Sequence, residues 1–220
     1  MIAGELISKS VLPLKLTDPV QVAINLFQDQ KLSHLPVVDG FTYIGMASEN
    51  DLLPYEYSGK TLEDFSGMFR KIFISPDLHL LEVFEAMIHE KTGIMPVAAE
   101  NSEYVGAIVG AELIPLTGKL LSADNPGGII ELEVHENDYI LSEIARIAEY
   151  NDAKILSLFI TSPDDSKLLK ITIKVNRIDL DPLLQTFERY SYKVVWSYSG
   201  DEASSLVKER FDSLKKFLEI

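Results

Sequence analysis

The sequence contains no cysteine, and this absence limits its covalent and metal chemistry. Neither a disulfide scaffold nor a thiolate metal site is open to it. Basic residues are also scarce, since 20 Lys and Arg stand against 34 Asp and Glu, and the formal net charge is −14. Such a surface repels the phosphates of nucleic acids and anionic lipids, so we expect neither nucleic acid nor membrane as a partner. An anionic ligand would need local N–H donors or a nearby cation.

Long apolar runs are missing as well. The first residues lack a basic segment followed by an apolar stretch, so we expect no signal peptide, and charges interrupt every window of membrane-spanning length. With the lack of cysteine, this favours a cytoplasmic protein. The sequence has no phosphate-binding glycine loop and no Gly-x-Ser-x-Gly motif, and its four histidines lack the spacing of a helical metal site. We therefore expect no metal site, no cofactor and no enzymatic activity.

The first half of the chain contains one pattern twice. Leu35-Pro36-Val37 corresponds to Met95-Pro96-Val97, 60 residues further on, and Tyr43–Ala47 corresponds to Tyr104–Ile108 after a slip of one residue in a turn. Each copy predicts a short extended stretch, a helix, two strands joined by a turn, and a closing helix. One such unit is too small to bury both faces of its sheet, so we expect the two copies to pack together.

The expected elements follow from apolar periodicity and turn residues. In the first copy they are an extended stretch at 14–16, a helix at 19–30, strands at 35–38 and 43–47, and a helix at 49–53. In the second copy they are a strand at 72–74, a helix at 80–90, strands at 94–98 and 104–109, and a helix at 111–121.

A cluster of chain-breaking residues at 122–128 separates a second pattern. The elements after it are expected in the order βαββαβ, the ferredoxin-like arrangement. A final amphipathic helix should pack either on this chain's own sheet or on a second subunit. The fold class is therefore α+β. The expected segments are repeats at 1–60 and 61–122, a ferredoxin-like domain at 128–200 and a C-terminal amphipathic helix at 201–220.

Ser48 and Asp51 are the candidate binding residues of the first repeat, because they stand where a strand ends and a helix begins. A hydroxyl and the free N–H groups of a first helical turn can hold a phosphate. A carboxylate three residues on can accept hydrogen bonds from the two hydroxyls of a ribose. The simpler alternative is that Ser48 caps the helix and Asp51 only favours its dipole.

The whole repeat resembles a CBS-domain pair, through its Leu-Pro-Val strand and its Gly45-Met-Ala-Ser48-x-x-Asp51 segment. The resemblance covers about residues 1–121. It implies two packed βαββα units and an adenosyl ligand, such as AMP, ADP, ATP or S-adenosylmethionine, in a cleft between them. Carried over residue by residue, it implies a nucleotide site formed by Ser48, Asp51, Thr17, Ser33, His34, Leu35 and Pro36.

The second repeat departs from this pattern. Val109 stands where the hydroxyl residue should be, and Glu112 where the Asp should be. A valine cannot donate a hydrogen bond to phosphate, and the longer Glu has a different reach. We therefore expect at most one good nucleotide site in each chain.

The second half resembles an ACT domain, a family that often binds amino acids where its first strand meets its first helix. The family's usual Asp-x-x-Gly is altered here, because Tyr139 stands at the glycine position. A tyrosine there would block or remodel the pocket, although Asn137 and Asp138 could still contact a ligand. The resemblance favours sheet pairing between two such domains. The order CBS, CBS, ACT resembles small bacterial proteins of the acetoin-utilization type.

The sequence thus favours a non-catalytic regulatory protein that senses an adenine nucleotide or a related adenosyl ligand, and that forms a homodimer. The alternative is a structural or interaction protein that regulates a partner, whose identity the sequence does not give, without a nucleotide. A nucleotide-hydrolysing enzyme is disfavoured, since no nucleophile, metal cluster or general base is placed for that reaction.

Overall fold

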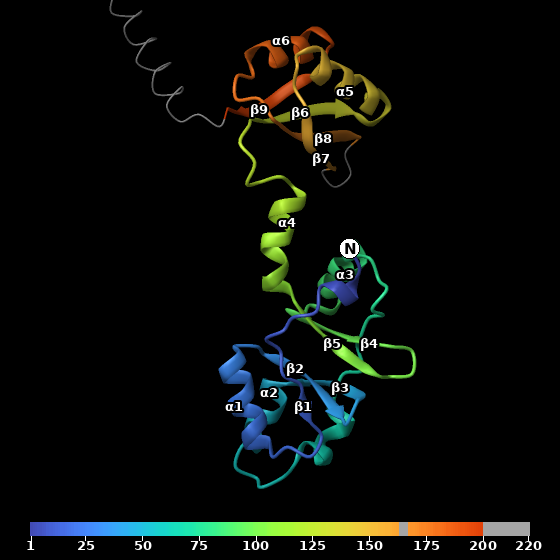
Figure 1. Ribbon diagram of the computed structural model, residues 1–220, viewed down its shortest axis with the longest axis vertical. Coiled ribbons are helices and arrows are strands. Elements are labelled where there is room, and N and C mark those ends of the chain that lie inside the picture. The colour runs from blue at the N-terminus through green and yellow to red at the C-terminus, as the bar shows by residue number, and fades with distance from the viewer. Residues whose placement is uncertain (163–166, 200–220) are drawn as a thin grey trace, which may run out of the picture. The chain divides into compact units, whose positions relative to one another are not determined.

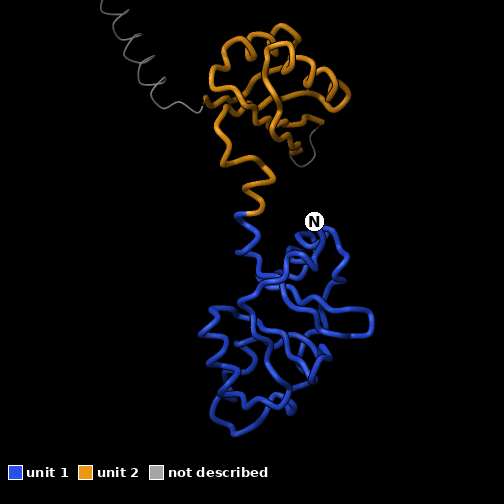
Figure 2. Tube along the Cα trace, viewed as in Figure 1, with its two compact units in different colours: residues 1–115 blue, residues 116–220 orange. Residues whose placement is uncertain are grey.

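The structure, a computed structural model, describes residues 1–162 and 167–199, so the predicted C-terminal helix at 201–220 lies outside the described residues. The chain forms two compact units, residues 1–115 and 116–220 (Figure 2). The division lies between Pro115 and Leu116, within the closing helix predicted at 111–121. It precedes the chain-breaking cluster at 122–128.

The first repeat forms a small three-stranded sheet in the order β1-β2-β3. β1 runs parallel to β2, and β2 pairs with β3 as an antiparallel hairpin. Its elements are β1 (Leu14–Lys15), α1 (Val20–Gln30), β2 (His34–Asp39), β3 (Thr42–Ser48) and α2 (Glu49–Leu52), followed by a 3₁₀ turn (Leu53–Tyr55). The buried side of α1 carries Val20, Ala23, Ile24 and Phe27, spaced as an amphipathic helix requires.

The second repeat follows the same course and begins after a 3₁₀ segment, Leu62–Met68. Its elements are α3 (Leu80–Glu90), β4 (Ile94–Ala98), β5 (Tyr104–Val109), a 3₁₀ turn (Gly110–Leu113) and α4 (Ile114–Leu120). The bounds of α3, β4 and β5 agree with those predicted. The helix expected at 111–121 is divided, because Pro115 stands in the first turn of α4, where a helix starts more readily than it continues.

The strand predicted at 72–74 is reduced to a single parallel bridge between Ile74 and Val97. The reason lies one step upstream. The carbonyl of Ile72 accepts a hydrogen bond from the Tyr43 hydroxyl of the first repeat, at 2.7 Å. The backbone is therefore engaged by the first repeat before it reaches β4, and only Ile74 adds to the second sheet.

The two repeats join through their hairpins. The Tyr43 N–H donates to the Ser102 carbonyl and the Tyr104 N–H donates to the Phe41 carbonyl, both at 2.8 Å. The rings of Tyr43 and Tyr104 stack with their centroids 6.2 Å apart. The expected packing of one copy on the other is therefore present, and it is nearly symmetrical.

Each hairpin is also crossed by a segment that comes from outside its own repeat. The N-terminal segment, residues 1–10, crosses the second repeat, where the Ser8 N–H donates to the Ala107 carbonyl at 2.8 Å. The linker between the repeats crosses the first one, where Arg70 and Met46 exchange two backbone hydrogen bonds of 2.8 and 3.1 Å. Figure 1 shows the N-terminus beside α3, the helix of the second repeat.

Within the described part of residues 129–198, the second unit forms a four-stranded antiparallel sheet with two α-helices (Figure 1). Its elements are β6 (Ile129–His135), α5 (Leu141–Tyr150), β7 (Ile155–Thr161), β8 (Leu168–Val175), α6 (Asp181–Arg189) and β9 (Lys193–Tyr198). The strand order β7-β8-β6-β9 and the succession βαββαβ correspond to the split βαβ arrangement. Ile130, Leu132 and Val134 alternate along β6 into a core shared with both helices.

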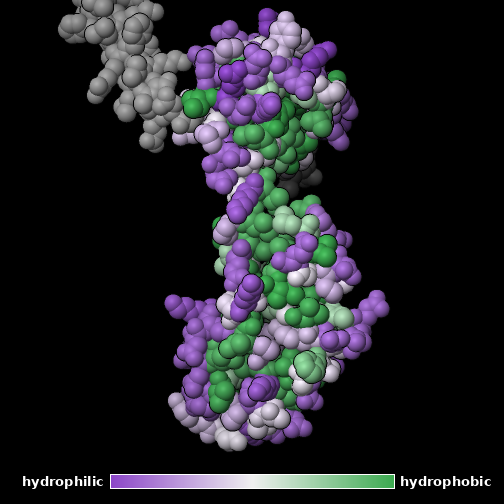
Figure 3. Space-filling model, in the orientation of Figure 1, coloured by the Kyte–Doolittle hydropathy of each residue, from purple (hydrophilic) through white to green (hydrophobic). Residues whose placement is uncertain are grey.

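Apolar side chains also reach the surface of both units, as the green areas in Figure 3 show. On α3, Leu81 and Ile88 are 67% and 75% exposed. Among the described residues, no helix has both the length and the apolar character needed to cross a membrane.

Candidate functional site

The candidate site of the first repeat is built at one end of the β2–β3 hairpin. Ser48, the last residue of β3, pairs with His34, the first residue of β2. The carbonyl of Ser33 accepts a hydrogen bond from the Glu49 N–H at 2.9 Å. Sheet pairing and this extra bond therefore bring Ser33, His34 and Ser48 together, and Asp51 follows in the single turn of α2.

The remaining predicted residues lie in two different places. Leu35 and Pro36 continue β2 from the site, and both are buried in the sheet, opposite Ala47 and Met46. Thr17 lies instead at the opposite end of β2, where it lines a separate cavity of about 470 Å³ with Asp39 and Gly40. The structure thus groups six of the seven predicted residues along one hairpin and places Thr17 apart from them.

The side chains of Ser48 and Asp51 make no hydrogen bond within the described residues. Ser48 holds the N-cap position of α2 with extended backbone angles, yet its hydroxyl makes no capping hydrogen bond. Within residues 1–162 and 167–199, neither the Ser48 hydroxyl nor the Asp51 carboxylate has a hydrogen-bond partner. Because α2 has only four residues, its dipole adds little to anion binding. Any anion here depends on the side chains and on N–H groups.

Electrostatics connects three of the side chains near the site. The pKa of His34 is lowered, first by burial and then by the positive charge of Arg70, while the charge of Asp51 acts in the opposite sense. The Nδ1 atom of His34 also lies 2.9 Å from the Ser33 hydroxyl. Arg70 is therefore close enough to influence His34, although sequence reasoning did not include it in the site.

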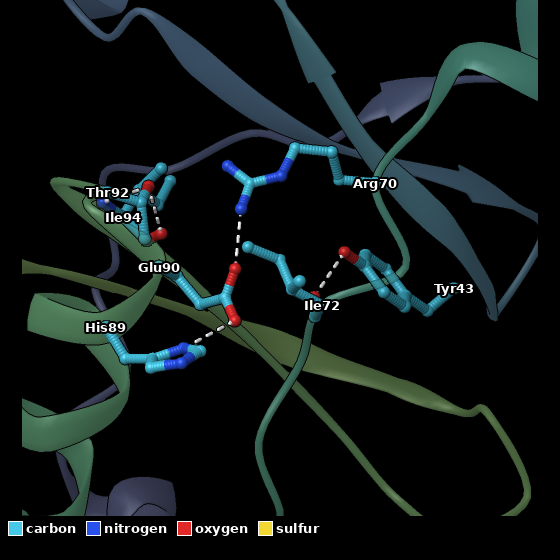
Figure 4. A network of polar contacts seen from close by, with 7 residues as sticks. All are labelled: Tyr43, Arg70, Ile72, His89, Glu90, Thr92 and Ile94. Atoms are coloured by element: carbon cyan, nitrogen blue, oxygen red, sulfur yellow. Dashed lines mark hydrogen bonds and ion pairs between the residues drawn. The ribbon is translucent and has the colours of Figure 1, made fainter.

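Arg70 is held in an ion pair with the second repeat. Its Nη2 atom lies 2.5 Å from Oε2 of Glu90, the last residue of α3. His89 Nδ1 lies 3.1 Å from the other carboxylate oxygen. Figure 4 shows the guanidinium of Arg70 and the carboxylate of Glu90 pointing toward one another. No motif marks either residue, because the pair joins segments that only the folded chain brings together.

The second repeat lacks an equivalent open position. Val109 is buried at the end of β5, and the Glu112 carboxylate accepts hydrogen bonds from the hydroxyls of Ser8 and Ser10, at 2.8 and 2.9 Å. These serines belong to the N-terminal segment that crosses the second hairpin. One oxygen of the carboxylate that would have to bind a ribose is thus already engaged by two hydroxyls of this chain.

The second unit places Asn137 and Asp138 in an exposed 3₁₀ turn between β6 and α5. Both line a cavity of about 530 Å³. In the same cavity the Tyr192 hydroxyl donates to Glu143 at 3.1 Å, and burial together with this bond raises the pKa of Tyr192 to about 12. The side chain of Tyr139 packs against the core of the unit and does not line this cavity.

No group of three or more His, Asp or Glu side chains with the geometry of a metal site occurs in the described ranges.

Several solved structures are similar to the first half of the chain. The putative acetoin utilization protein AcuB from Vibrio cholerae is 23% identical over 56% of this chain and 95% of its own, with a TM-score of 0.47. CBSX2, a protein of Arabidopsis thaliana whose structure contains AMP, is 18% identical over 54% and 96%, with a TM-score of 0.46. The CBS pair of protein MJ0100, in complex with 5′-methylthioadenosine and S-adenosyl-L-methionine, is 19% identical over 54% and 97%, with a TM-score of 0.43.

The comparison with family models gives one match. It covers residues 3–57, the segment that contains Ser33, His34, Ser48 and Asp51. That segment matches the CBS domain.

Proposed function

We propose that this chain is a non-catalytic regulatory protein that senses an adenine nucleotide or a related adenosyl ligand in the first repeat. One observation carries the proposal. Ser48 and Asp51 have no hydrogen-bond partner among the described residues, whereas the corresponding Glu112 is occupied by Ser8 and Ser10. Because Asp51 is exposed and Ser48 is half-buried, both side chains are accessible to a ligand. The CBS domain match over the same segment supports this assignment.

In this proposal each group has one task. The Asp51 carboxylate accepts hydrogen bonds from both ribose hydroxyls, and the Ser48 hydroxyl binds the group attached to the 5′ carbon. Ser33 and His34 border the site, and the backbone of Leu35 and Pro36 contacts the base. The candidate ligands are AMP, ADP, ATP and S-adenosylmethionine.

Isothermal titration calorimetry with these four ligands tests the site. Asp51→Ala should weaken ligand binding by about 1.5–3 kcal/mol, which is what a hydrogen bond to a charged group contributes. Glu112→Ala is the matched control, because it removes the corresponding carboxylate of the second repeat and should leave the affinity unchanged. If the wild type binds none of the four ligands, or if the two variants behave alike, the proposal is wrong.

The regulatory part of the proposal is a shift between two arrangements of the repeats, toward the one with higher ligand affinity. We assign the second unit an ACT-like role in which its sheet pairs with that of a second chain, giving a homodimer in the cytoplasm. Asn137 and Asp138 are the residues of this unit that would contact a small ligand. A strictly monomeric mass in light scattering at micromolar concentration would contradict the dimer.

The alternative is an interaction protein without a nucleotide, and the exposed apolar surface of α3 favours it. Leu81 and Ile88 border an open groove of about 1020 Å³ that also contains Phe73 and Phe84. The titrations separate the two functions, since an interaction protein would bind none of the four ligands. An ATP turnover assay addresses the enzyme class, and we expect no turnover.

A further inference from the structure

A phosphate at Ser48 faces an unfavourable field unless a cation joins it. Two carboxylates, Glu49 and Asp51, stand in the turn after Ser48, and the whole chain carries a formal charge of −14. The single turn of α2 offers little dipole to offset them. A positively charged side chain close to Ser48 would therefore decide whether a phosphate can bind there.

Arg70 is placed to supply that charge. Two backbone hydrogen bonds fix it to Met46, which precedes Ser48 on β3 by two residues. Its charge also lowers the pKa of His34, the cross-strand partner of Ser48. The side chain is 43% exposed, so it can reorient while its backbone stays in place.

We propose that Arg70 is the residue that recognises phosphate in the first-repeat site, and that Glu90 competes with the ligand for it. The inference rests on the proposed function, and it adds the chemical class of the ligand: an adenosine derivative that carries phosphate. In the free protein Arg70 is paired with Glu90, and in the bound protein it is paired with the ligand. A guanidinium suits both partners, because its planar N–H groups match carboxylate and phosphate alike.

The second repeat has no arginine at the position that corresponds to Arg70. Ser8, on the segment that crosses the second hairpin, makes the backbone contact that Arg70 makes in the first. Ser8 carries no charge, and its hydroxyl is already bonded to Glu112. In this proposal the first repeat recognises phosphate through the segment that crosses its hairpin, and not through the hairpin itself.

The exchange also connects the site to the other repeat. Glu90 is the last residue of α3 and lines the same groove as Ile88. When the ligand takes Arg70, the end of α3 loses its ion pair with the linker. A phosphate bound in the first repeat would thus alter the surroundings of the groove on the second repeat.

Calorimetry with two probes isolates the role of Arg70. AMP and 5′-methylthioadenosine share the adenosine part, but only AMP carries a phosphate. Arg70→Gln should weaken AMP binding by roughly ten- to hundredfold, the loss of one charge-assisted bond, and should leave 5′-methylthioadenosine within about twofold. Glu90→Gln should strengthen AMP binding and leave the other probe unchanged. Lys71→Gln is the matched control, since it removes the same charge one residue away and should change neither affinity.

The outcomes separate this inference from the proposed function. Equal weakening of both probes by Arg70→Gln would mean a structural role for Arg70. An AMP affinity that Glu90→Gln leaves unchanged or lowers would overturn the competition, and this arm remains decisive if the Arg70 variant does not fold. If 5′-methylthioadenosine binds the wild type while AMP does not, the adenosyl site stands and the inference fails. If neither probe binds, the inference fails, and the titrations with ADP, ATP and S-adenosylmethionine decide separately whether the adenosyl site stands.

Discussion

The two repeats of the first unit share the order of their elements and a backbone contact at the end of the hairpin, but they carry different side chains at corresponding positions. The Glu49 N–H bonds to the Ser33 carbonyl at 2.9 Å, and in the second repeat the Gly110 N–H bonds to the Gly93 carbonyl at 2.8 Å. At the same positions Ser48 is replaced by Val109. The comparison teaches that a duplicated fold supplies two frames for a site, while the side chains decide which frame can bind.

The segments that cross the hairpins add a second difference. Arg70 brings an exposed cation to the first hairpin, whereas Ser8 and Ser10 bring hydroxyls that occupy Glu112 in the second. Because each hairpin is crossed by a segment from outside its own repeat, residues of that segment contribute side chains to the hairpin they cross. Four experiments test whether the two repeats differ in this way.

The largest effect is expected where a crossing segment lies directly on a glycine. A Cβ atom at Gly45 would stand 2.8 Å from the Phe69 Cβ and 3.2 Å from the Arg70 carbonyl oxygen, so Gly45→Ala should lower the free energy of unfolding by about 1–3 kcal/mol. At Gly106 the three nearest atoms all belong to the side chain of Ile7, with Cγ2 at 2.4 Å. Because a side chain can change rotamer and a backbone carbonyl cannot, Gly106→Ala should cost less. Urea denaturation measures both.

A double variant provides the control for this prediction. Combined with Ile7→Ala, Gly106→Ala should cost less than it does alone, since the clashing methyl group is gone. Equal losses in the free energy of unfolding for Gly45→Ala and Gly106→Ala would show that the two crossing segments are packed alike.

A smaller effect should separate the two acidic residues. Glu112→Ala removes two hydrogen bonds to serine hydroxyls, and we expect a loss of about 1 kcal/mol in the free energy of unfolding. Asp51→Ala removes no hydrogen bond among the described residues and should change that free energy by less than about 0.5 kcal/mol. The same denaturation experiment compares them. A greater loss for Asp51→Ala would mean that Asp51 serves the fold and not a ligand.

Sequence reasoning predicted the regular elements well and the contacts between them poorly. Apolar periodicity was sufficient to set the bounds of α3, β4 and β5, because these signals are local. The same periodicity predicted a strand at 72–74 that does not form fully, since the hydroxyl of the distant Tyr43 donates a hydrogen bond to the carbonyl of Ile72.

The same reason applies to the candidate site. Ser48 and His34 meet through strand pairing, which the sequence could indicate. Arg70 and Glu90 could not be found, because an ion pair between a linker and the end of a helix leaves no periodic signal. Aligning the two crossing segments with one another places Arg70 beside Ser8. That difference in charge is the signal that would have pointed to Arg70.

The pH dependence of the site should differ between the repeats, because His34 corresponds to Ile94 in the second. The pKa of His34 is lowered from 6.5 by burial and by Arg70, so below pH 6.5 the unfolded chain binds more protons at this position than the folded one. His34 should therefore contribute a loss of stability as the pH falls below 6.5, and His34→Gln should reduce that loss. NMR titration of the His34 ring gives the shift directly. A pKa at or above 6.5, or one that Arg70→Gln fails to raise, would contradict this electrostatic picture.

The smallest effect on folding is expected on the exposed side of α3. Gln21 and Gln28 of α1 correspond to Leu81 and Ile88 of α3, so Leu81→Gln with Ile88→Gln gives α3 the surface of α1. Because both side chains are mostly exposed, the free energy of unfolding should change by less than about 0.5 kcal/mol. If α3 contributes to the proposed dimer, light scattering should show a lower mass for the variant. An unchanged mass would show that these two side chains of α3 take no part in it.

The crossing of the N-terminal segment has a consequence for synthesis on the ribosome. Ser8 is made about one hundred residues before its partner Ala107. At roughly 5–20 residues per second, the segment waits on the order of 5–20 s before its place exists. The linker at Arg70 follows Met46 closely, so the first hairpin can be completed while the second is still being made. The repeat that carries the proposed site is therefore the one that the chain can finish early.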